Sequence, residues 1–261
     1  MKHLITVTIL FTFIFVSLNI AGSKDETTQT LKDAVALTIK ANLYYDREMF
    51  EQAANSFESL LKNEPSNKIA LYHLTFTEYR LLEISLSKGN EDLFDKYYEK
   101  SVKHAEQISS DKILSSEGKT LLAAIYMMKI ANSPFSAVTL SGTVHDLLDD
   151  AQKLQPKNPR SYIIRGIMKF NTPSMFGGSK EDAMKNFNKA ISIFEREEIV
   201  DSTAPNWGYL ESLAWLGRVN TALENYETAL YAYKKALNVE PNFMWVKMNL
   251  LPNLQKKMNG K

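Results

Sequence analysis

Apolar residues recur at helical spacing in three segments of this chain that all end in the same way. The segments are "FEQAANSFESLLKNEPSN" (50–67), "HDLLDDAQKLQPKNP" (145–159) and "YETALYAYKKALNVEPNF" (226–243), and they close on Pro65, Pro156 and Pro241. Apolar residues three and four apart share one face of a helix, and proline cannot continue the helix. The pattern predicts amphipathic helices that repeat along the chain, and no segment is predicted as a strand.

The best-preserved repeat spans Leu210–Phe243. Large residues at Leu213 and Leu216 are followed by small residues at Gly217 and Ala229. A side chain larger than a methyl group at either small position would push two crossing helices apart, so both are interpreted as structural. Repeats of one helix pair are typical of a solenoid, in which each pair packs on its neighbours.

Less regular helix pairs fill the rest of the chain. They are expected over 31–65, 68–108, 114–154 and 162–196, with the register of the third pair left open. After the last repeat, "FMWVKMNLL" (243–251) is expected to form a closing helix that Pro252 ends or kinks. The sequence therefore predicts an all-α solenoid of about five helix pairs plus a C-terminal closing helix.

The first residues are organised like an export signal. Lys2 precedes an apolar run over residues 4–21, and small residues then stand before the charged "KDE". A basic start, an apolar middle and a small-residue exit are typical of a secretory signal peptide. We expect a cleaved signal over 1–23, a helical-repeat domain over 24–261 and a periplasmic location. The alternative is an inner-membrane anchor over residues 4–21, which is just long enough to span a bilayer.

Composition narrows the classes of partner. The chain has no cysteine, which excludes disulfides, thiol catalysis and a lipid-modified cysteine at the cleavage site. Its 31 basic residues nearly balance its 30 acidic ones, and loss of Lys2 with the signal would make the two numbers equal. A nucleic-acid binder should carry a basic excess. Nucleic acid is therefore not an expected partner, and a membrane is expected only through an uncleaved signal anchor.

Three short motifs imitate functional sites. Gly118-Lys119-Thr120 matches only the end of a phosphate-binding P-loop, since Ile113 stands where that motif needs another glycine. "SLSK" (85–88) lacks the companion motifs of penicillin-recognising enzymes. "NTPSMFGGSKED" (171–182) is interpreted as a corner between helices: Ser179 caps the second helix, Asp182 reaches back, and Met175 or Phe176 fills the gap.

The histidines do not form a metal-binding pattern. His73, His104 and His145 lie far apart and are interpreted as ordinary surface or half-buried histidines. No group of residues suited to running a reaction is present in the sequence. We therefore expect a protein that is not an enzyme and that has no metal site and no cofactor.

The repeat over Leu210–Phe243 resembles the tetratricopeptide repeat (TPR), whose pattern is large, large, small, then small, aromatic, small, proline. With "NTPSMFGGSKEDAMKNFNKAI", "PNWGYLESLAWLG" and "PNFMWVKMNLLPNL", the chain resembles exported TPR proteins of Gram-negative bacteria. A weaker similarity links it to periplasmic TPR subunits associated with TRAP transporters, which are typically lipid-anchored. The resemblance implies a TPR-like scaffold with no catalytic residues.

In TPR arrays, fixed positions on the first helix of each pair line a concave groove. These positions give ten candidate binding residues here: Tyr45, Tyr72, Phe76, Tyr79, Arg80, Arg160, Ile163, Ile167, Phe170 and Arg218. Aromatic residues and arginine are frequent anchors in protein interfaces. We expect a protein or peptide partner in this groove. A small apolar ligand, or an accessory role beside a transporter's solute-binding protein, is the alternative. The sequence leaves open whether the aromatic residues are exposed or belong to the core.

Overall fold

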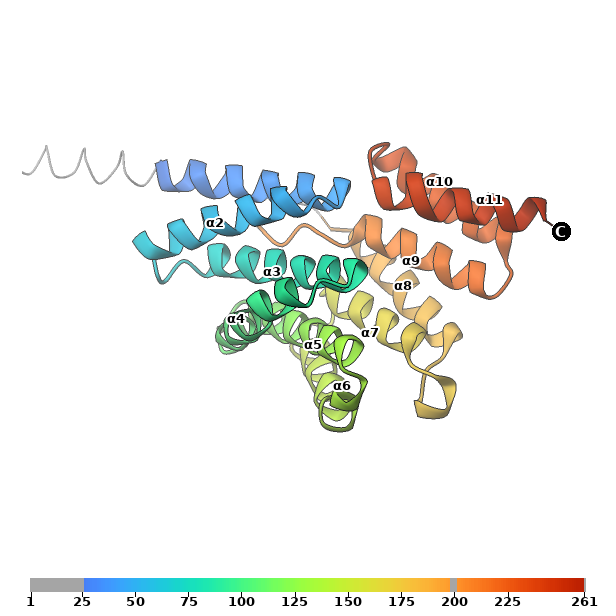
Figure 1. Ribbon diagram of the computed structural model, residues 1–261, viewed down its shortest axis with the longest axis horizontal. Coiled ribbons are helices and arrows are strands. Elements are labelled where there is room, and N and C mark those ends of the chain that lie inside the picture. Colours follow the sequence, from blue (N-terminus) through green and yellow to red (C-terminus); the bar gives the residue numbers. More distant parts are fainter. Residues whose placement is uncertain (1–25, 198–200, 261) are drawn as a thin grey trace, which may run out of the picture.

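The computed structural model describes residues 26–197 and 201–260, and every regular element in these ranges is a helix (Figure 1). A first helix over residues 26–44 precedes α2 (Arg47–Asn63), α3 (Lys68–Lys88), α4 (Glu91–Ser109), α5 (Ser115–Asn132), η1 (Pro134–Ser136), α6 (Ala137–Leu154), α7 (Pro159–Asn171), η2 (Ser174–Phe176), α8 (Lys180–Phe194), α9 (Tyr209–Ala222), α10 (Tyr226–Val239), the π-helical η3 (Trp245–Leu250) and α11 (Leu251–Asn259). The predicted all-α fold is confirmed.

Consecutive helices pack in pairs that stack into a TPR-like solenoid. The helix over 26–44 shares an apolar cluster with α2, and α3/α4, α5/α6, α7/α8 and α9/α10 form the following pairs. The η3–α11 segment packs on α10 and closes the array. Five helix pairs and a closing helix were predicted, and this arrangement is confirmed.

Side chains cap the starts of several helices. Asp46, Asn67, Asn90 and Ser179 each accept a backbone N–H of the first turn at 2.9–3.1 Å. Each cap satisfies a donor that the helix itself leaves unpaired, which fixes where the helix begins. The cap by Ser179 was predicted, and it turns the chain from α7 into α8.

Two further details of that corner were predicted wrongly. The carboxylate of Asp182 pairs with Lys185, whereas the N–H of Ser179 donates to the carbonyl of Lys169. Met175 and Phe176 do not fill a gap between helices, because 81% and 69% of their surfaces are exposed.

Glycines mark the closest helix crossings. A Cβ placed on Gly217 would lie 2.2 Å from the ring of Tyr233, so α9 and α10 meet as the sequence predicted. A Cβ on Gly118 would lie 2.3 Å from the backbone nitrogen of Ser109, where α5 passes the end of α4. Gly118 thus has a packing role inside α5.

Pro252 does not end the closing helix. The segment runs as a π-helix over Trp245–Leu250 and continues as α11, in which Pro252 occupies the first turn. Proline has no N–H to donate, and it follows the π-helical turn in which the N–H of Leu251 donates to the carbonyl of Val246, five residues earlier.

The first and last repeats meet. Asn42, near the end of the first helix, donates a hydrogen bond from Nδ2 to the Glu211 carboxylate of α9, and Leu43 packs on the apolar cluster of α9 and α10. Figure 1 shows the blue first helix ending beside the red C-terminal helices. The concave side of the solenoid is therefore bordered by both the first and the last repeat.

The predicted signal or anchor over residues 1–23 lies outside the described residues. Among the described helices, none combines the length and apolar character needed to cross a bilayer.

Candidate functional site

A pocket of about 490 Å³ lies on the concave side of the solenoid, and we call it the concave pocket. Six segments contribute to it: the end of the first helix, α3, α7, the loop before α9, α9 itself and the η3 segment. Its size is in the range of ligand-binding clefts. Segments far apart in the sequence thus form one site because the two ends of the solenoid meet.

Aromatic rings form the α9 side of the concave pocket. The Trp215 ring stacks on Phe187 with centroids 6.0 Å apart and meets Trp245 edge-to-face at 5.7 Å. Arg218 lies on this aromatic wall, with its guanidinium carbon 4.0 Å from the Trp215 centroid and 5.4 Å from that of Phe170. Such cation–π contacts hold the side chain in place while its nitrogens remain available as donors.

Arg218 makes no ion pair within the part of the chain that the structure describes. Burial lowers the pKa of this arginine from its usual value, and the nearby Tyr233 only partly opposes that shift. A half-buried cation without a carboxylate gains more from an added anion than a fully hydrated one does. Arg218 is therefore suited to bind an anionic group that enters the pocket.

A second charged group lines the opposite side of the concave pocket. Arg80 and Glu83 of α3 form an ion pair, and Arg80 also lies 5.5 Å from the ring centroid of Tyr45. Burial by itself would lower the pKa of Arg80, but its neighbours, Glu83 foremost, outweigh this effect and the net pKa is raised. Nε of Arg80 is a buried donor with no hydrogen-bond partner. On this wall the arginine is paired with a carboxylate, whereas Arg218 has no ion-pair partner among the described residues.

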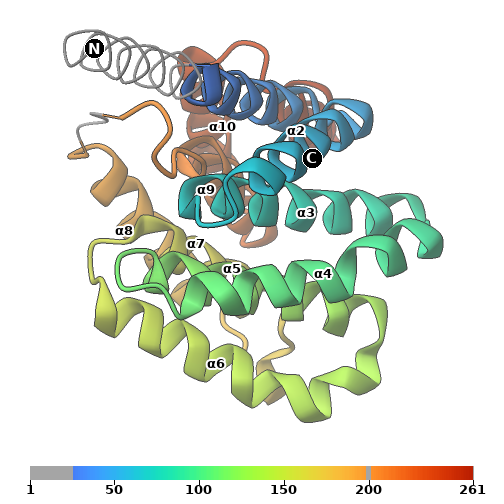
Figure 2. The same cartoon turned by 90° about the vertical axis from the view of Figure 1, so that its left-hand side faces the viewer.

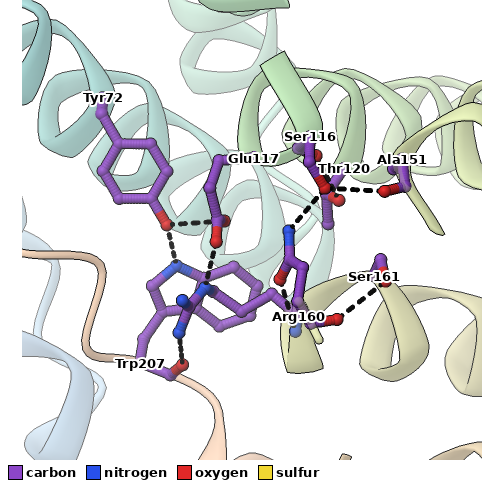
Figure 3. Close-up of polar contacts among 9 residues, drawn as sticks. Tyr72, Ser116, Glu117, Thr120, Ala151, Arg160, Ser161 and Trp207 are labelled. Atoms are coloured by element: carbon purple, nitrogen blue, oxygen red, sulfur yellow. Dashed lines mark hydrogen bonds and ion pairs between the residues drawn. The ribbon is translucent and has the colours of Figure 1, made fainter. Parts of the chain in front are cut away.

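Residues 201–208, which we call the strap, cover part of the predicted groove. The Trp207 ring stacks on Phe76 with centroids 4.8 Å apart, and its Nε1 donates to the hydroxyl of Tyr72 at 2.8 Å (Figure 3). Nε2 of His73 lies 2.7 Å from the carbonyl of Thr203. The strap thus occupies groove space that a ligand would need in an open array.

A buried polar network supports the strap (Figure 3). Arg160 donates from Nε to Glu117 at 2.8 Å and from Nη1 to the carbonyl of Trp207 at 3.3 Å. Tyr72 donates to the same carboxylate at 3.2 Å, and burial together with Glu117 holds the pKa of Tyr72 well above its usual value. Every charge in this network has a partner, so its role is structural.

The ten candidate binding residues fall into three groups. Six line the concave pocket: Tyr45, Tyr79, Arg80, Ile163, Ile167 and Arg218. Phe170 lies beside it and contacts Arg218 and Trp215. Tyr72, Phe76 and Arg160 are buried against the strap. The sequence left open whether the aromatic candidates are exposed or core: Tyr72, Phe76 and also Tyr79 belong to the core, whereas Tyr45 is 36% exposed.

Sequence reasoning missed the tryptophans of the site. Trp207, Trp215 and Trp245 all line the concave pocket, although none was a candidate. A signal was present, because all three lie in the segments "PNWGYLESLAWLG" and "PNFMWVKMNLLPNL". Their convergence depends on the strap and on the packing of η3, which generic repeat positions do not describe.

A second cavity, of about 970 Å³, lies between α5, α6, α7 and η2, and we call it the α5–α7 cavity. One of its lining helices, α6, lies on the edge of the molecule opposite the first helix (Figure 2). Its lining has no lysine, arginine, aspartate or glutamate, and its one titratable side chain is His145. Val138 and Phe176 at this cavity are 89% and 69% exposed, so apolar surface extends to its mouth.

The motifs that imitate functional sites have structural roles. Lys119 pairs with Asp150 at 2.8 Å, and the hydroxyl of Ser85 donates to the carbonyl of Leu82 within α3. Within residues 26–197 and 201–260, no three His, Asp or Glu side chains are grouped to hold a metal ion. His73, predicted to be a surface or half-buried histidine, is in fact fully buried.

Comparisons with known proteins agree with this fold. Residues 210–243 match the family model of the tetratricopeptide repeat. The HusA haemophore from Porphyromonas gingivalis superimposes with a TM-score of 0.61 at 20% identity, covering 75% of this chain and 93% of its own. The TPR protein TTC0263 from Thermus thermophilus gives a TM-score of 0.58 at 17% identity, covering 86% and 99%. At these identities the similarity concerns the fold alone. A comparison with curated proteins gave no match.

Proposed function

We propose that this protein is a non-catalytic scaffold that binds a peptide segment of a partner protein in the concave pocket. The observation that carries the proposal is Arg218, a half-buried cation with no carboxylate partner among the described residues, fixed on an aromatic wall. Tryptophan, tyrosine and arginine in desolvated pockets are the residues that supply most binding energy in protein interfaces. The TPR-like fold supports the same class of function.

The chemistry of the pocket specifies the kind of peptide. Trp215 and Trp245 offer an apolar surface for one aromatic or aliphatic side chain, and Arg218 offers a site for a carboxylate beside it. Tyr44 and Met248, which are exposed at the rim of the pocket, would contact the backbone of the bound peptide on either side of that side chain. The signal-like segment over 1–23 supports a partner in the periplasm.

The test is selection of random displayed peptides on the mature chain, followed by affinity measurements on variants. Arg218→Met keeps the packing on Trp215 but removes the charge, and it should weaken an enriched peptide about tenfold or more, as loss of a charge-assisted hydrogen bond predicts. Tyr231→Ala is the matched control, because Tyr231 is 68% exposed and does not line the concave pocket. Equal affinity for wild type and Arg218→Met would contradict the proposal.

A second candidate function is capture of a small apolar molecule, and the α5–α7 cavity favours it. A volume of about 970 Å³ without an acidic or basic side chain in its lining suits a largely apolar ligand. The structurally similar protein from P. gingivalis is described as a haemophore, so a porphyrin is the first probe to use. Titration of the mature chain with metal-free protoporphyrin IX, followed by its fluorescence, tests this candidate; absence of saturable binding would contradict it.

A further inference from the structure

The α5–α7 cavity holds one side chain that can ligate a metal through nitrogen, and that side chain has no partner in the described part of the protein. His145 of α6 is half-buried and lines the cavity. Within the described residues its ring nitrogens make no hydrogen bond or ion pair. By contrast, Nε2 of His73 is bonded to the Thr203 carbonyl and Nδ1 of His104 to Glu78. Among the three histidines in the described part of the chain, His145 is therefore the one with neither ring nitrogen bonded.

The position of His145 follows from the packing of α6. Val144 and Leu148 are fully buried, so the helix turns one apolar stripe inward and presents His145 on the flank beside it. Val144 and His145 line the cavity together. The imidazole thus sits at the boundary between an apolar wall and the open side of the cavity.

The rest of the lining fits a flat apolar ring. Met127 and Met128 of α5 and Met168 of α7 line the same cavity, and unbranched thioether side chains adapt their shape to a ligand. Lys169 follows Met168 and donates from Nζ to the carbonyl of Gly177 at 2.9 Å, next to the lining residue Phe176. The ammonium group of Lys169 therefore lies near the η2 end of the cavity, while the residues that line the cavity carry no acidic or basic group apart from His145.

We propose that His145 ligates the iron of a haem bound in the α5–α7 cavity, which rests on the second candidate function above. Haem joins an apolar macrocycle, two carboxylates and an iron that accepts histidine as an axial ligand. The apolar walls suit the macrocycle, Lys169 near one end suits a carboxylate, and the unpartnered imidazole of His145 suits the iron. No local pattern in the sequence indicates this arrangement, since His145 fits no metal-binding spacing.

Two probes separate porphyrin capture from iron ligation. Ferric haem and metal-free protoporphyrin IX are titrated into the mature wild-type chain, the His145→Ala variant and the Ser141→Ala variant. Ser141 lines the same cavity and cannot replace imidazole as an iron ligand, so it is the matched control. We expect His145→Ala to shift the Soret band and to weaken haem binding about tenfold or more. Metal-free porphyrin binding should change less than about twofold, and added imidazole should restore the wild-type spectrum.

Each outcome decides between the two proposals. An unchanged Soret band in His145→Ala overturns ligation by His145 while leaving porphyrin capture in place. Failure of both probes to bind the wild-type chain overturns porphyrin capture itself. Retained binding of the metal-free porphyrin shows that the variant is folded, so a spectral change cannot be attributed to unfolding.

Discussion

Two sets of buried or half-buried charged residues differ in whether they have a partner. Glu117 and Arg160 are buried and paired with each other, and each makes a further hydrogen bond to a neighbouring element. Arg218 is half-buried against aromatic rings and has no carboxylate partner among the described residues. Breaking a buried pair leaves an uncompensated charge and is strongly destabilising, whereas removing an unpaired cation relieves a desolvation cost. The first set belongs to the fold, and the second is available for binding.

His73 predicts a pH dependence of stability. Burial lowers its pKa from 6.5 to about 4, with Arg160 adding to the shift and the Thr203 carbonyl and Asp201 opposing it. Between these two pKa values the unfolded chain binds a proton that the folded chain does not. The free energy of unfolding should therefore fall by about 3 kcal/mol as the pH drops from about 6.5 to about 4.

Urea unfolding of wild type and His73→Gln at several pH values measures this effect. Glutamine cannot take up the proton, so the variant should lack this part of the decline. Other titrating groups, such as the buried Glu78 and Glu83, are common to both proteins, and the difference between the two curves isolates His73. Parallel curves for the two proteins would contradict the lowered pKa.

At the scale of helices, close crossings and caps determine where each element lies. Gly118 brings α5 against the end of α4, and the strap is held by contacts to α3 and α7. The strap contacts help to define the concave pocket, because α3, α7 and Trp207 of the strap all line it. The Gly118 crossing involves helices that do not line this pocket, so a change there is expected to act on stability.

Two glycine substitutions should have opposite effects. Gly118→Ala places a methyl group 2.3 Å from backbone that cannot move aside, and overpacking of this kind costs about 1–3 kcal/mol or more. In Gly142→Ala, on α6, the new methyl group meets nothing within 4 Å, and the higher helix propensity of alanine should stabilise by up to about 1 kcal/mol. Thermal unfolding compares the two variants; equal melting temperatures would contradict the close crossing.

At the scale of the whole molecule, the contact between the first and last repeats decides the shape of the site. Asn42 and Glu211 lie 169 positions apart and join the first helix to α9. Tyr44 of the first helix and Met248 of η3 line the same pocket. A solenoid that remained open would present a long groove rather than a pocket.

Asn42→Asp should open this contact. It places two carboxylates where one donor and one acceptor now meet, and we expect a loss of about 1–3 kcal/mol in unfolding free energy. Small-angle X-ray scattering should show a larger radius of gyration. In the Asn42→Asp/Glu211→Gln double variant the amide can again donate, which should restore compactness. An unchanged radius in the single variant would contradict a closed array.

Local features of the sequence predicted the repeat, its helix pairs and the cap at Ser179, because helical spacing, proline and capping residues act over a few positions. Four of the candidate binding residues, Tyr45, Tyr79, Arg80 and Arg218, line the concave pocket, and their binding role stays a prediction. The same reasoning erred where neighbours in space decide the outcome, as for the exposed Met175 and Phe176 and for the fully buried His73.

The sequence by itself thus determined an all-helical repeat array with a balanced charge and no recognisable catalytic motif. Only the tertiary structure decided that the strap buries Tyr72 and Phe76, that three tryptophans and Arg218 line one pocket, and that His145 faces an uncharged cavity. The physical reason is the separation along the chain over which the interactions act. Helix formation depends on residues three and four positions apart, whereas these sites depend on packing between segments that lie far apart in the chain, which no local pattern records.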